Sequence, residues 1–586
     1  MPTPWLSDER PSLSRFPSLV HLLLERRQAD SSAVPFTFLE RGEHPVSALE
    51  LGELLERARR VAVQLRSRAD VGHRVLLVFP HDLDFVIGFL GCLFAGVVAV
   101  PTVPPTNRRA VESLLALRAA TRPSLVLASS SWIPLLAPVL QNGDAGTIEC
   151  RAIDDLVAEP EASLALPAPT SRDLAYLQFT SGSTGVPKGV EVTHGNLLHN
   201  GGLLLEALDA GPGSRMVSWL PFFHDWGLVG SVVLPLVSGM PCFLLDPVEF
   251  IYDPFRWLLA ISRHRATIGC APNFAYELCC DAITEDQKSG LDLSSWEVAM
   301  VGAEPVRKVT LERFARLFAR CGFRREAFYP AYGLAENTLI VSGGRRDAPP
   351  VYLDVDRRSL ERRRIARSHD GDPDRNRSVS LVGCGRALGD ESVVIANPAT
   401  AMPCGDGEIG EVWVSGGSVT RGYWERRDDT DEKYFAALRN GDRANYLRTG
   451  DIGFVSNGEL FLCGRSEDVI IKGGNNYFAE DVEHVAEAAH ASLRPGCGAA
   501  FAVDVSELER LVIVHELGYG KRPTPQEVID RVQQEMLDAF GMPADAIVLI
   551  QPGSLPKTTS RKICRQLTRA LFLRAELKTV ASWRRW

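Results

Sequence analysis

The stretch Thr180-Ser-Gly-Ser-Thr-Gly-Val-Pro-Lys-Gly189 follows directly on a strand-like apolar run from Leu174 to Phe179. Its glycines permit turn conformations in which backbone N–H groups can converge on phosphate oxygens. The serine and threonine hydroxyls add hydrogen-bond donors, and Lys188 adds a positive charge. The spacing is not that of a P-loop, because Lys188 is followed by glycine. A mobile Ser/Gly surface loop is the alternative, but the Pro-Lys-Gly ending before two valines favours a phosphate-binding loop.

Upstream of this loop, helical and strand-like patterns alternate along the chain. Ser47-Ala-Leu-Glu50 predicts a capping box that opens an amphipathic helix through Leu65. Strands are expected at 74–79, 97–100 and 124–128, with helices ending near Leu93 and beginning after Asn107. This alternation predicts a mostly parallel sheet with helices on its faces. Ligands bind at the carboxyl ends of such strands, where the 180–189 loop would lie.

Downstream, the pattern predicts a large N-terminal domain, residues 1–465, and a small α+β C-terminal domain, residues 466–586. A glycine-rich, charged stretch around 462–476 supplies the expected boundary and hinge. Within the small domain, Thr524-Pro-Gln-Glu527 predicts a capped helix that stops at Gly541. The run at about 351–378 is dense in arginine and acidic residues, which is typical of a solvated insertion or mobile loop.

Composition sets limits on the protein's class. At 586 residues the chain exceeds one hydrophobic core, and its net charge of -9 argues against general nucleic-acid binding. Twelve scattered cysteines without a C-x-x-C pair, and an N-terminus without signal-peptide character, lead us to expect a cytoplasmic protein. Two long apolar runs, 85–103 and 229–245, are broken by glycine and proline. We therefore expect helix-then-strand segments and no stable membrane insertion.

Four further residues carry possible chemistry. His224, in Trp219-Leu-Pro-Phe-Phe-His-Asp-Trp-Gly227, is equally compatible with positioning a substrate carboxylate and with satisfying a core hydrogen bond. Tyr332 offers a ring on which a base could stack, and Glu336 offers an oxygen ligand for a hard cation. Alternatively, these two belong to a helix N-terminus with a buried tyrosine. Asp451, expected in a tight turn, could accept hydrogen bonds from a sugar diol or stabilise its own turn.

Taken together, the motifs resemble the adenylate-forming superfamily of acyl-CoA synthetases, luciferases and nonribosomal adenylation domains. The similarity runs from about residue 30 to 570, in the order TSGSTGVPKG, YPAYGLAENT, GEIGEVWVSG, YLRTGDIGF, GRSEDVIIKGGNNY and LPKTTSRK. Within the superfamily the chain is most similar to the fatty acyl-AMP ligases, because of WLPFFHDWGL, APNFAYELC, VGAEPVR and the charged insertion. The resemblance implies a large domain of mixed, mostly parallel sheets flanked by helices and a small mobile α+β domain.

The resemblance also implies a role for each matching residue. It places Lys562, His224 and Lys188 at the reaction centre, with Lys562 as the mobile lysine of adenylation. The ATP- and AMP-binding set is Thr180, Ser181, Gly182, Ser183, Thr184, Gly185, Lys188, Gly302, Ala303, Tyr332, Gly333, Asp451 and Arg465. Thr184 and Glu336 would hold Mg²⁺, Glu467 and Asp468 form the hinge, and Trp219, Phe222, Phe223 and Phe274 line the acyl pocket. The family has glycine before the lysine, where this chain has Arg561.

The activity implied is ATP-dependent conversion of a medium- to long-chain fatty acid to acyl-AMP. The acyl group would then pass to the phosphopantetheine thiol of a separate acyl carrier protein, since the chain shows no carrier domain. Two alternatives remain open. One is a fatty acyl-CoA synthetase, and the other is a non-catalytic ATP-binding or scaffold protein, which the departure at Arg561 favours.

Overall fold

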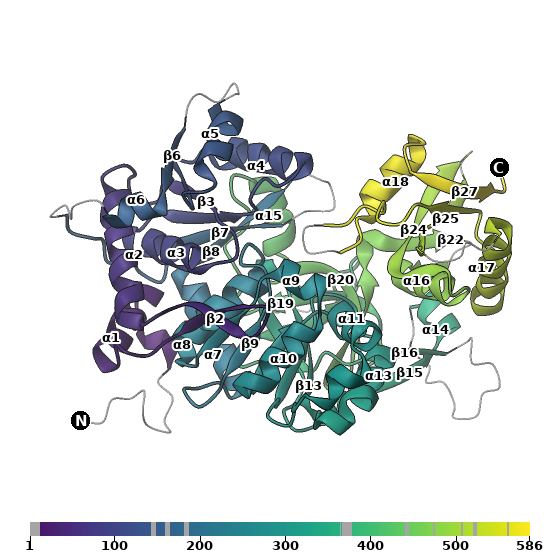
Figure 1. Ribbon diagram of the computed structural model, residues 1–586. Helices are drawn as coiled ribbons and strands as arrows, with labels where there is room; N and C mark the ends of the chain where they lie inside the picture. Colours follow the sequence, from purple (N-terminus) through teal and green to yellow (C-terminus); the bar gives the residue numbers. More distant parts are fainter. Residues whose placement is uncertain are drawn as a thin grey trace.

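The computed structural model describes residues 12–141, 148–158, 164–180, 187–363, 365, 378–439, 445–472, 475–505, 508–519, 524–558 and 562–586. Figure 1 shows a large N-terminal part, which includes the strands as far as β20, and a smaller C-terminal part beside it. No helix of the described residues is long and apolar enough to span a bilayer. All twelve cysteines are free thiols, as expected.

Two large sheets form the centre of the N-terminal part. In the six-stranded sheet all neighbours are parallel except the last pair, β7 and β8. In order across the sheet, its strands are β6 Glu149–Ala152, β5 Leu125–Ala128, β3 Arg74–Val78, β4 Val98–Thr102, β7 Leu174–Thr180 and β8 Lys188–Thr193. The nine-stranded sheet comprises β17 Arg386–Ala387, β14 Ile340–Gly343, β13 Phe328–Gly333, β12 Val298–Val301, β11 Ile268–Ala271, β9 Met216–Ser218, β10 Cys242–Leu244, β1 Phe36–Glu40 and β2 His44–Leu49. Its six central strands, from β13 to β1, are parallel. The predicted mostly parallel α/β architecture is confirmed.

Helices bury apolar faces against these sheets. The long ones are α1 Leu19–Ala29, α2 Leu51–Arg66, α3 Leu83–Ala95, α4 Arg108–Thr121, α7 His194–Leu208, α10 Phe255–His264, α11 Asn273–Ala282 and α13 Lys308–Phe318. Shorter ones are α5 Ile133–Gln141, α6 Ile153–Ala158, α8 Leu234–Ser238, α9 Pro247–Tyr252, α12 Glu285–Ser289 and α15 Arg427–Tyr434. Both long apolar runs form a helix followed by a strand, as predicted. In the second run a π-helix, Trp226–Val233, precedes α8.

One predicted helix start is wrong. Ser47 to Glu50 form no capping box, because residues 44–49 are strand β2, which pairs antiparallel with β1. The helix begins at Leu51, three residues later than a box capped by Ser47 predicts, and Glu50 makes no side-chain cap hydrogen bond. The predicted apolar face through Leu65 is nevertheless buried. Tertiary strand pairing has overridden a local capping signal here.

The C-terminal part has its own sheet and its own core. The sheet contains β24 Leu493–Val505, β25 Leu508–Leu517, β26 Ala546–Ile550 and β27 Thr579–Arg584, packed with α16 Ala479–Ala488, α17 Pro525–Phe540 and α18 Arg565–Leu573. Helix α17 starts at the expected proline and ends at Gly541, whose φ of 67° requires glycine-like freedom. Thr524 makes no cap hydrogen bond to the backbone, so the expected capping box is absent. The boundary at residue 465 and the mobility of this part stay predictions.

The charged insertion is more ordered than its composition predicts. Strands β15 Tyr352–Asp356 and β16 Ser378–Val382 pair antiparallel, and helix α14 Arg357–Glu361 follows β15; residues 364 and 366–377 lie outside the described residues. Arg357 is buried, and its guanidinium donates to both oxygens of Asp481 in α16, at 2.7 and 2.9 Å. It also lies over the Phe540 ring of α17, at 4.9 Å. The insertion therefore docks on the C-terminal part, as Figure 1 shows.

The carboxyl of Glu361 makes this docking contact sensitive to pH. Burial raises its pKa to about 7, assisted by Asp481 and Asp356, and Arg358 and Arg357 oppose the rise only in part. The folded protein therefore holds this proton more tightly than the unfolded chain, and stability falls as pH rises from the ordinary pKa of 4.5 to about 7. We expect Glu361→Gln to raise the unfolding temperature relative to wild type at about pH 8 but not at about pH 5. Thermal scans at both values test this, and an equal shift at both would contradict it.

Candidate active site

Strands β7 and β8, which flank the phosphate-loop motif, pair antiparallel. Thr180 pairs with Lys188 in register, and its hydroxyl donates to the Lys188 carbonyl at 3.5 Å. The Lys188 ammonium donates to Asp429 Oδ1 at 2.6 Å and lies 5.1 Å from the centre of the Tyr423 ring. This ion pair holds the pKa of Asp429 below its ordinary value. The predicted phosphate ligands Ser181, Gly182, Ser183, Thr184 and Gly185 lie outside the described residues.

Glu336 contacts the hydroxyl of the same tyrosine. The Tyr423 hydroxyl donates to Glu336 Oε1 at 2.6 Å, so one side chain contacts both Lys188 and Glu336. Among the described residues Tyr423 is the only hydrogen-bond donor to the Glu336 carboxylate. The second oxygen of the Glu336 carboxylate is thus available to a hard cation. Mg²⁺ prefers such oxygen ligands.

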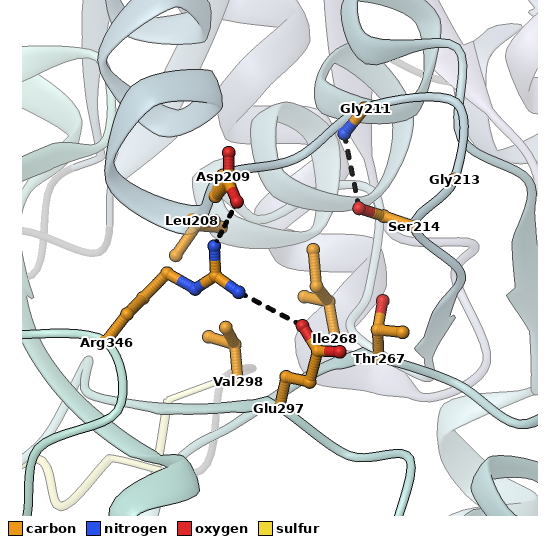
Figure 2. Close-up of a pocket in the computed structure, with 10 residues that line it drawn as sticks. All are labelled: Leu208, Asp209, Gly211, Gly213, Ser214, Thr267, Ile268, Glu297, Val298 and Arg346. Carbon is orange, nitrogen blue, oxygen red and sulfur yellow. Dashed lines mark hydrogen bonds and ion pairs between the residues drawn. The ribbon is translucent and has the colours of Figure 1, made fainter.

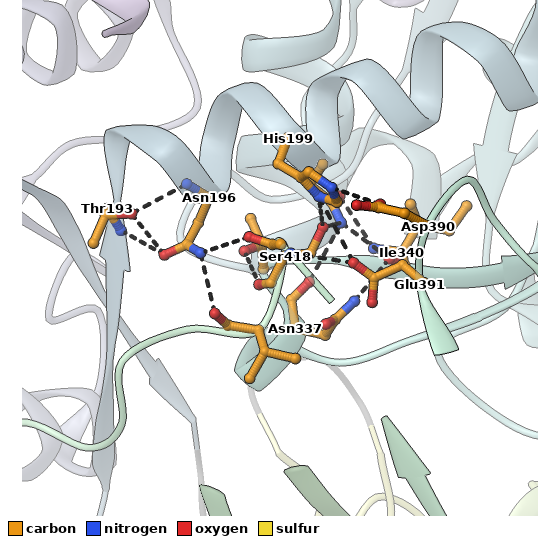
Figure 3. Close-up of polar contacts among 12 residues, drawn as sticks. Thr193, Asn196, His199, Asn337, Ile340, Asp390, Glu391 and Ser418 are labelled. Atoms are coloured by element: carbon orange, nitrogen blue, oxygen red, sulfur yellow. Dashed lines mark hydrogen bonds and ion pairs between the residues drawn. The ribbon is translucent and has the colours of Figure 1, made fainter. Parts of the chain in front are cut away.

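A polar network fixes the backbone around Glu336. The backbone N–H and the hydroxyl of Thr420 both donate to the Glu336 carbonyl, each at 3.0 Å. The adjoining Ser418 hydroxyl bonds to His199 Nδ1 at 2.7 Å and accepts from Asn200 at 3.0 Å (Figure 3). His199 also lies near two carboxylates, but both of its ring nitrogens are used in hydrogen bonds. The network is therefore structural support for the Glu336 segment.

Tyr332, Asp451 and Arg465 form a second group. The Tyr332 hydroxyl donates to Asp451 Oδ2 at 2.6 Å, and Arg465 Nε lies 3.3 Å from Asp451 Oδ1. Burial and the Asp451 charge raise the pKa of Tyr332 well above its ordinary value. The prediction that Asp451 lies in a tight turn is wrong. It lies within strand β20 Leu447–Ser456 and pairs with Arg465 at the end of β21 Glu459–Arg465. These two strands belong to a four-stranded antiparallel sheet with β18 Ser392–Ala396 and β19 Gly410–Ser415.

Two glycines near Tyr332, Gly302 and Gly333, stand where the backbone leaves no room for a side chain. A Cβ on Gly302 would lie 2.6 Å from the Ala331 carbonyl oxygen, and one on Gly333 would lie 1.9 Å from the Leu339 carbonyl oxygen. Both positions therefore need glycine. Ala303, next to Gly302, has a φ of 62°, an uncommon conformation for alanine. The structure thus brings the expected base-lining residues Gly302 and Ala303 into the nine-stranded sheet region that carries Tyr332.

His224 forms an ion pair with its neighbour Asp225. Its Nδ1 lies 2.5 Å from Asp225 Oδ1, an oxygen that also caps the π-helix through the Trp226 N–H. Burial favours the neutral acid, but the charges of His224 and Lys562 hold the pKa of Asp225 below its ordinary value. The charge of Lys562, from the C-terminal part, thus acts on Asp225, and the Lys562 side chain is exposed. The neighbouring Arg561 lies outside the described residues.

The four aromatic residues expected in an acyl pocket fall into two groups. Trp219 stacks on Phe250 at 3.9 Å and lies 6.1 Å from Phe274. Phe222 instead stacks on His81 at 3.8 Å, and Phe223 contributes its carbonyl to a hydrogen bond from Gln178 at 2.9 Å. Only Trp219 and Phe274 are brought together, and the assignment of all four stays a prediction.

The hinge residues occupy a short 3₁₀ turn, Ser466–Asp468, after β21. Glu467 lies 3.7 Å from Arg465, and Asp468 accepts from Arg565 at 2.6 Å. The turn leads into the small hairpin β22 Val469–Lys472 and β23 Asn475–Phe478. The turn thus connects the Asp451–Arg465 pair with the C-terminal part.

A separate surface pocket of about 290 Å³ lies at the amino ends of central strands of the nine-stranded sheet. It contains Ile268 and Val298, the first residues of β11 and β12, whereas the residues above follow the carboxyl ends of these strands. Arg346 bridges Asp209 and Glu297 across it (Figure 2). The pocket is therefore not part of the candidate active site.

Sequence reasoning missed Tyr423 and Asp429. Both follow the expected GEIGEVWVSG strand, in Arg421-Gly-Tyr-Trp-Glu-Arg-Arg-Asp-Asp429, and neither has a local pattern that marks it as functional. Asp429 lies 241 residues from Lys188 along the chain, so only the fold joins them.

Known proteins share this fold and part of this sequence. The family model of AMP-binding enzymes matches residues 26–424. The medium-chain fatty acid–[acyl-carrier-protein] ligase JamA of Moorena producens (strain JHB) is 39% identical over 573 residues, which are 97% of this chain and 97% of that protein.

Two solved structures are similar over nearly their full length. One, from a study of fatty acyl-adenylate ligases from E. coli and L. pneumophila, has a TM-score of 0.87 at 32% identity and covers 97% of this chain and 99% of its own. The other, a fatty acyl-adenylate ligase from L. pneumophila in complex with acyl adenylate and pyrophosphate, has a TM-score of 0.75 at 32% identity, covering 98% and 99%. These matches confirm the resemblance drawn from the motifs, and the chain belongs to the adenylate-forming family of AMP-binding enzymes.

Proposed function

We propose that the protein converts a medium- to long-chain fatty acid and ATP to acyl-AMP and pyrophosphate, and then passes the acyl group to the phosphopantetheine thiol of a separate acyl carrier protein. The observation that carries the proposal is the presence of two polar groups, Lys188–Tyr423–Glu336 and Tyr332–Asp451–Arg465, together with the charge of Lys562, in the C-terminal part, acting on Asp225. The names of the similar ligases support the fatty acid and the carrier as reactants.

Charge is the main obstacle in the first step. A fatty acid with a pKa of about 4–5 is already ionised at neutral pH, so its activation needs little acid–base help. The carboxylate must however approach a strongly anionic triphosphate. Lys188 would lose its contact with Asp429 and bind the departing phosphates, and Lys562 would join the carboxylate to the α-phosphate.

Tyr332 and its partners would bind the nucleoside. The ring of Tyr332 would stack on adenine, while the backbone at Gly302 and Ala303 lines the base. Asp451 presents a carboxylate that could accept from the ribose hydroxyls, and Arg465 holds it in place at 3.3 Å.

Mg²⁺ fits the oxygen ligand that Glu336 presents. When bound there, with Thr184 as a second ligand, the cation would neutralise phosphate charge. The chain's own contribution is to orient Glu336 through the Tyr423 hydroxyl and the Thr420 contacts.

The acceptor in the second step distinguishes this proposal from an acyl-CoA synthetase. The insertion helix α14 is tied to the C-terminal part by the buried Arg357–Asp481 pair. This contact would restrain the rotation of the C-terminal part toward a pose that uses free CoA.

A product assay tests the proposed function. The full chain is incubated with ATP, Mg²⁺ and a ladder of saturated fatty acids, with CoA, with a phosphopantetheinylated carrier protein, or with neither. We expect pyrophosphate and acyl-AMP in all three cases, and a thioester only with the carrier. Efficient acyl-CoA formation would favour the synthetase, and absence of pyrophosphate with every acid would favour a non-catalytic protein.

Loosening the insertion should alter the choice of acceptor. We expect Arg357→Ala to increase acyl-CoA formation relative to carrier acylation, because it leaves Asp481 buried without its partner and weakens the docking. Arg358→Ala, which changes the exposed neighbour in the same helix, is the matched control. Rates with CoA and with carrier are compared for both variants. An unchanged ratio in a folded Arg357→Ala protein would show that this contact does not restrain the C-terminal part.

A further inference from the structure

Arg565 is the centre of a buried ionic cluster in the C-terminal part. It begins helix α18, three residues after Lys562. Its guanidinium donates to both oxygens of Glu483, at 2.7 and 2.8 Å, and to Asp468 at 2.6 Å, and it lies 3.7 Å from Glu480. The side chains of Arg565 and Asp468 are only 12% and 13% exposed. One cation thus joins α16, α18 and the turn that follows β21.

The lysine loop is closely tied to helix α18. The Thr558 N–H donates to the Lys562 carbonyl at 2.7 Å, and the Lys562 N–H donates back to the Thr558 hydroxyl at 3.0 Å. The Cys564 N–H donates to the Pro556 carbonyl at 2.9 Å, which closes the base of the loop. In Figure 1 the segment before α18 extends toward the large part. A displacement of Arg565 would therefore move the backbone of Lys562.

The other end of the cluster lies beside the nucleotide-binding group. Asp468 ends the turn that begins directly after Arg465, and Arg465 contacts Asp451. Asp451 thus contacts Arg465, the backbone of the turn leads from Arg465 to Asp468, and Asp468 contacts Arg565, which lies three residues from Lys562.

We infer that Arg565 is a positioning residue, which makes the placement of Lys562 depend on the turn at 466–468. The inference rests on the proposed function, in which Lys562 acts in acyl-AMP formation. Rotation about the turn and withdrawal of Lys562 are then a single movement. The bidentate, planar contact with Glu483 requires arginine, because lysine is a single point of charge.

The test removes the link without removing Arg565. Asp468→Asn keeps the shape of the turn and leaves the Arg565–Glu483 pair intact. We expect it to slow single-turnover pyrophosphate release with ATP and dodecanoate by about 10- to 100-fold, the cost typical of a small misplacement of a reacting group. KM for ATP should change little, because the nucleotide contacts remain. Arg565→Lys should slow the same step, but less than Arg565→Met.

A double variant separates positioning from general stability. In the Lys562→Ala background, Asp468→Asn should slow the step no further, because the group that it positions is absent. Arg569→Met is the matched control, since Arg569 lies one turn further along α18 and donates to a backbone carbonyl, that of Ala502, at 2.9 Å. It should leave the rate unchanged. Thermal unfolding of each variant confirms that it is folded.

Two results would overturn the inference alone: a wild-type rate in folded Asp468→Asn, or multiplicative effects of Asp468→Asn and Lys562→Ala. A wild-type rate in Lys562→Ala would overturn the role of the lysine, and the inference with it.

Discussion

Lys562→Ala is expected to slow acyl-AMP formation by about 10²- to 10³-fold, the usual cost of losing one well-placed donor to a developing charge. The Lys562 side chain is exposed, and its charge contributes to the lowered pKa of Asp225. Its contribution should therefore appear in the transition state more than in ATP binding. Rapid-quench measurement of acyl-AMP in a single turnover gives the rate, and calorimetry gives the ATP affinity.

Lys578→Ala is the control for charge, because it removes another exposed lysine of the C-terminal part. It should leave both quantities near their wild-type values. If Lys562→Ala retained full activity, the adenylating role of this lysine would be wrong. If ATP affinity fell as steeply as the rate, Lys562 would be a binding group in the ground state.

Asp451→Asn is expected to weaken ATP binding by about 10- to 100-fold, since a hydrogen bond to a charged group contributes about 1.5–3 kcal/mol. The change keeps the size of the side chain but removes the charge that pairs with Arg465 and accepts from Tyr332. Tyr332→Phe is the comparison variant, because it keeps the stacking ring and removes only the hydroxyl. It should weaken binding less. Calorimetric titration with a non-hydrolysable ATP analogue measures both, and equal affinities for wild type and Asp451→Asn would contradict the ribose assignment.

The alternation of helices and strands was predictable because it depends on local periodicity. Strands β3 and β5 and helices α3 and α4 form within a few residues of the expected positions, since each buries a continuous apolar face. At two positions where the predicted local structure is wrong, pairing with a neighbouring strand is the reason. Residues 44–49 carry a helix-capping pattern but pair with β1 instead. Asp451 was expected in a tight turn between apolar segments, yet it pairs with Arg465 inside the β20–β21 ladder, whose register shifts between Ile452 and Gly453.

The site was predictable only where one motif carries one role. Lys188, Glu336, Tyr332 and Arg465 each stand in a recognisable motif. In the structure the first two contact Tyr423 and the last two contact Asp451, while their roles stay predictions. Tyr423 does not stand out in the sequence, because its importance comes from touching Lys188 and Glu336 at once. The contact of Arg357 with the C-terminal part could not be predicted either, because composition does not distinguish one buried arginine from its exposed neighbours in an arginine-rich run.

The contact between Lys188 and Asp429 has a consequence for ligand choice. In this state a carboxylate of the chain already occupies the lysine that the phosphates need. A nucleoside without phosphates could not compete for that ammonium, whereas a triphosphate brings enough negative charge to displace the carboxylate. Only a ligand that binds this ammonium has to displace the Asp429 carboxylate, so Asp429→Asn should tighten the binding of phosphorylated nucleotides and leave the affinity for adenosine unchanged.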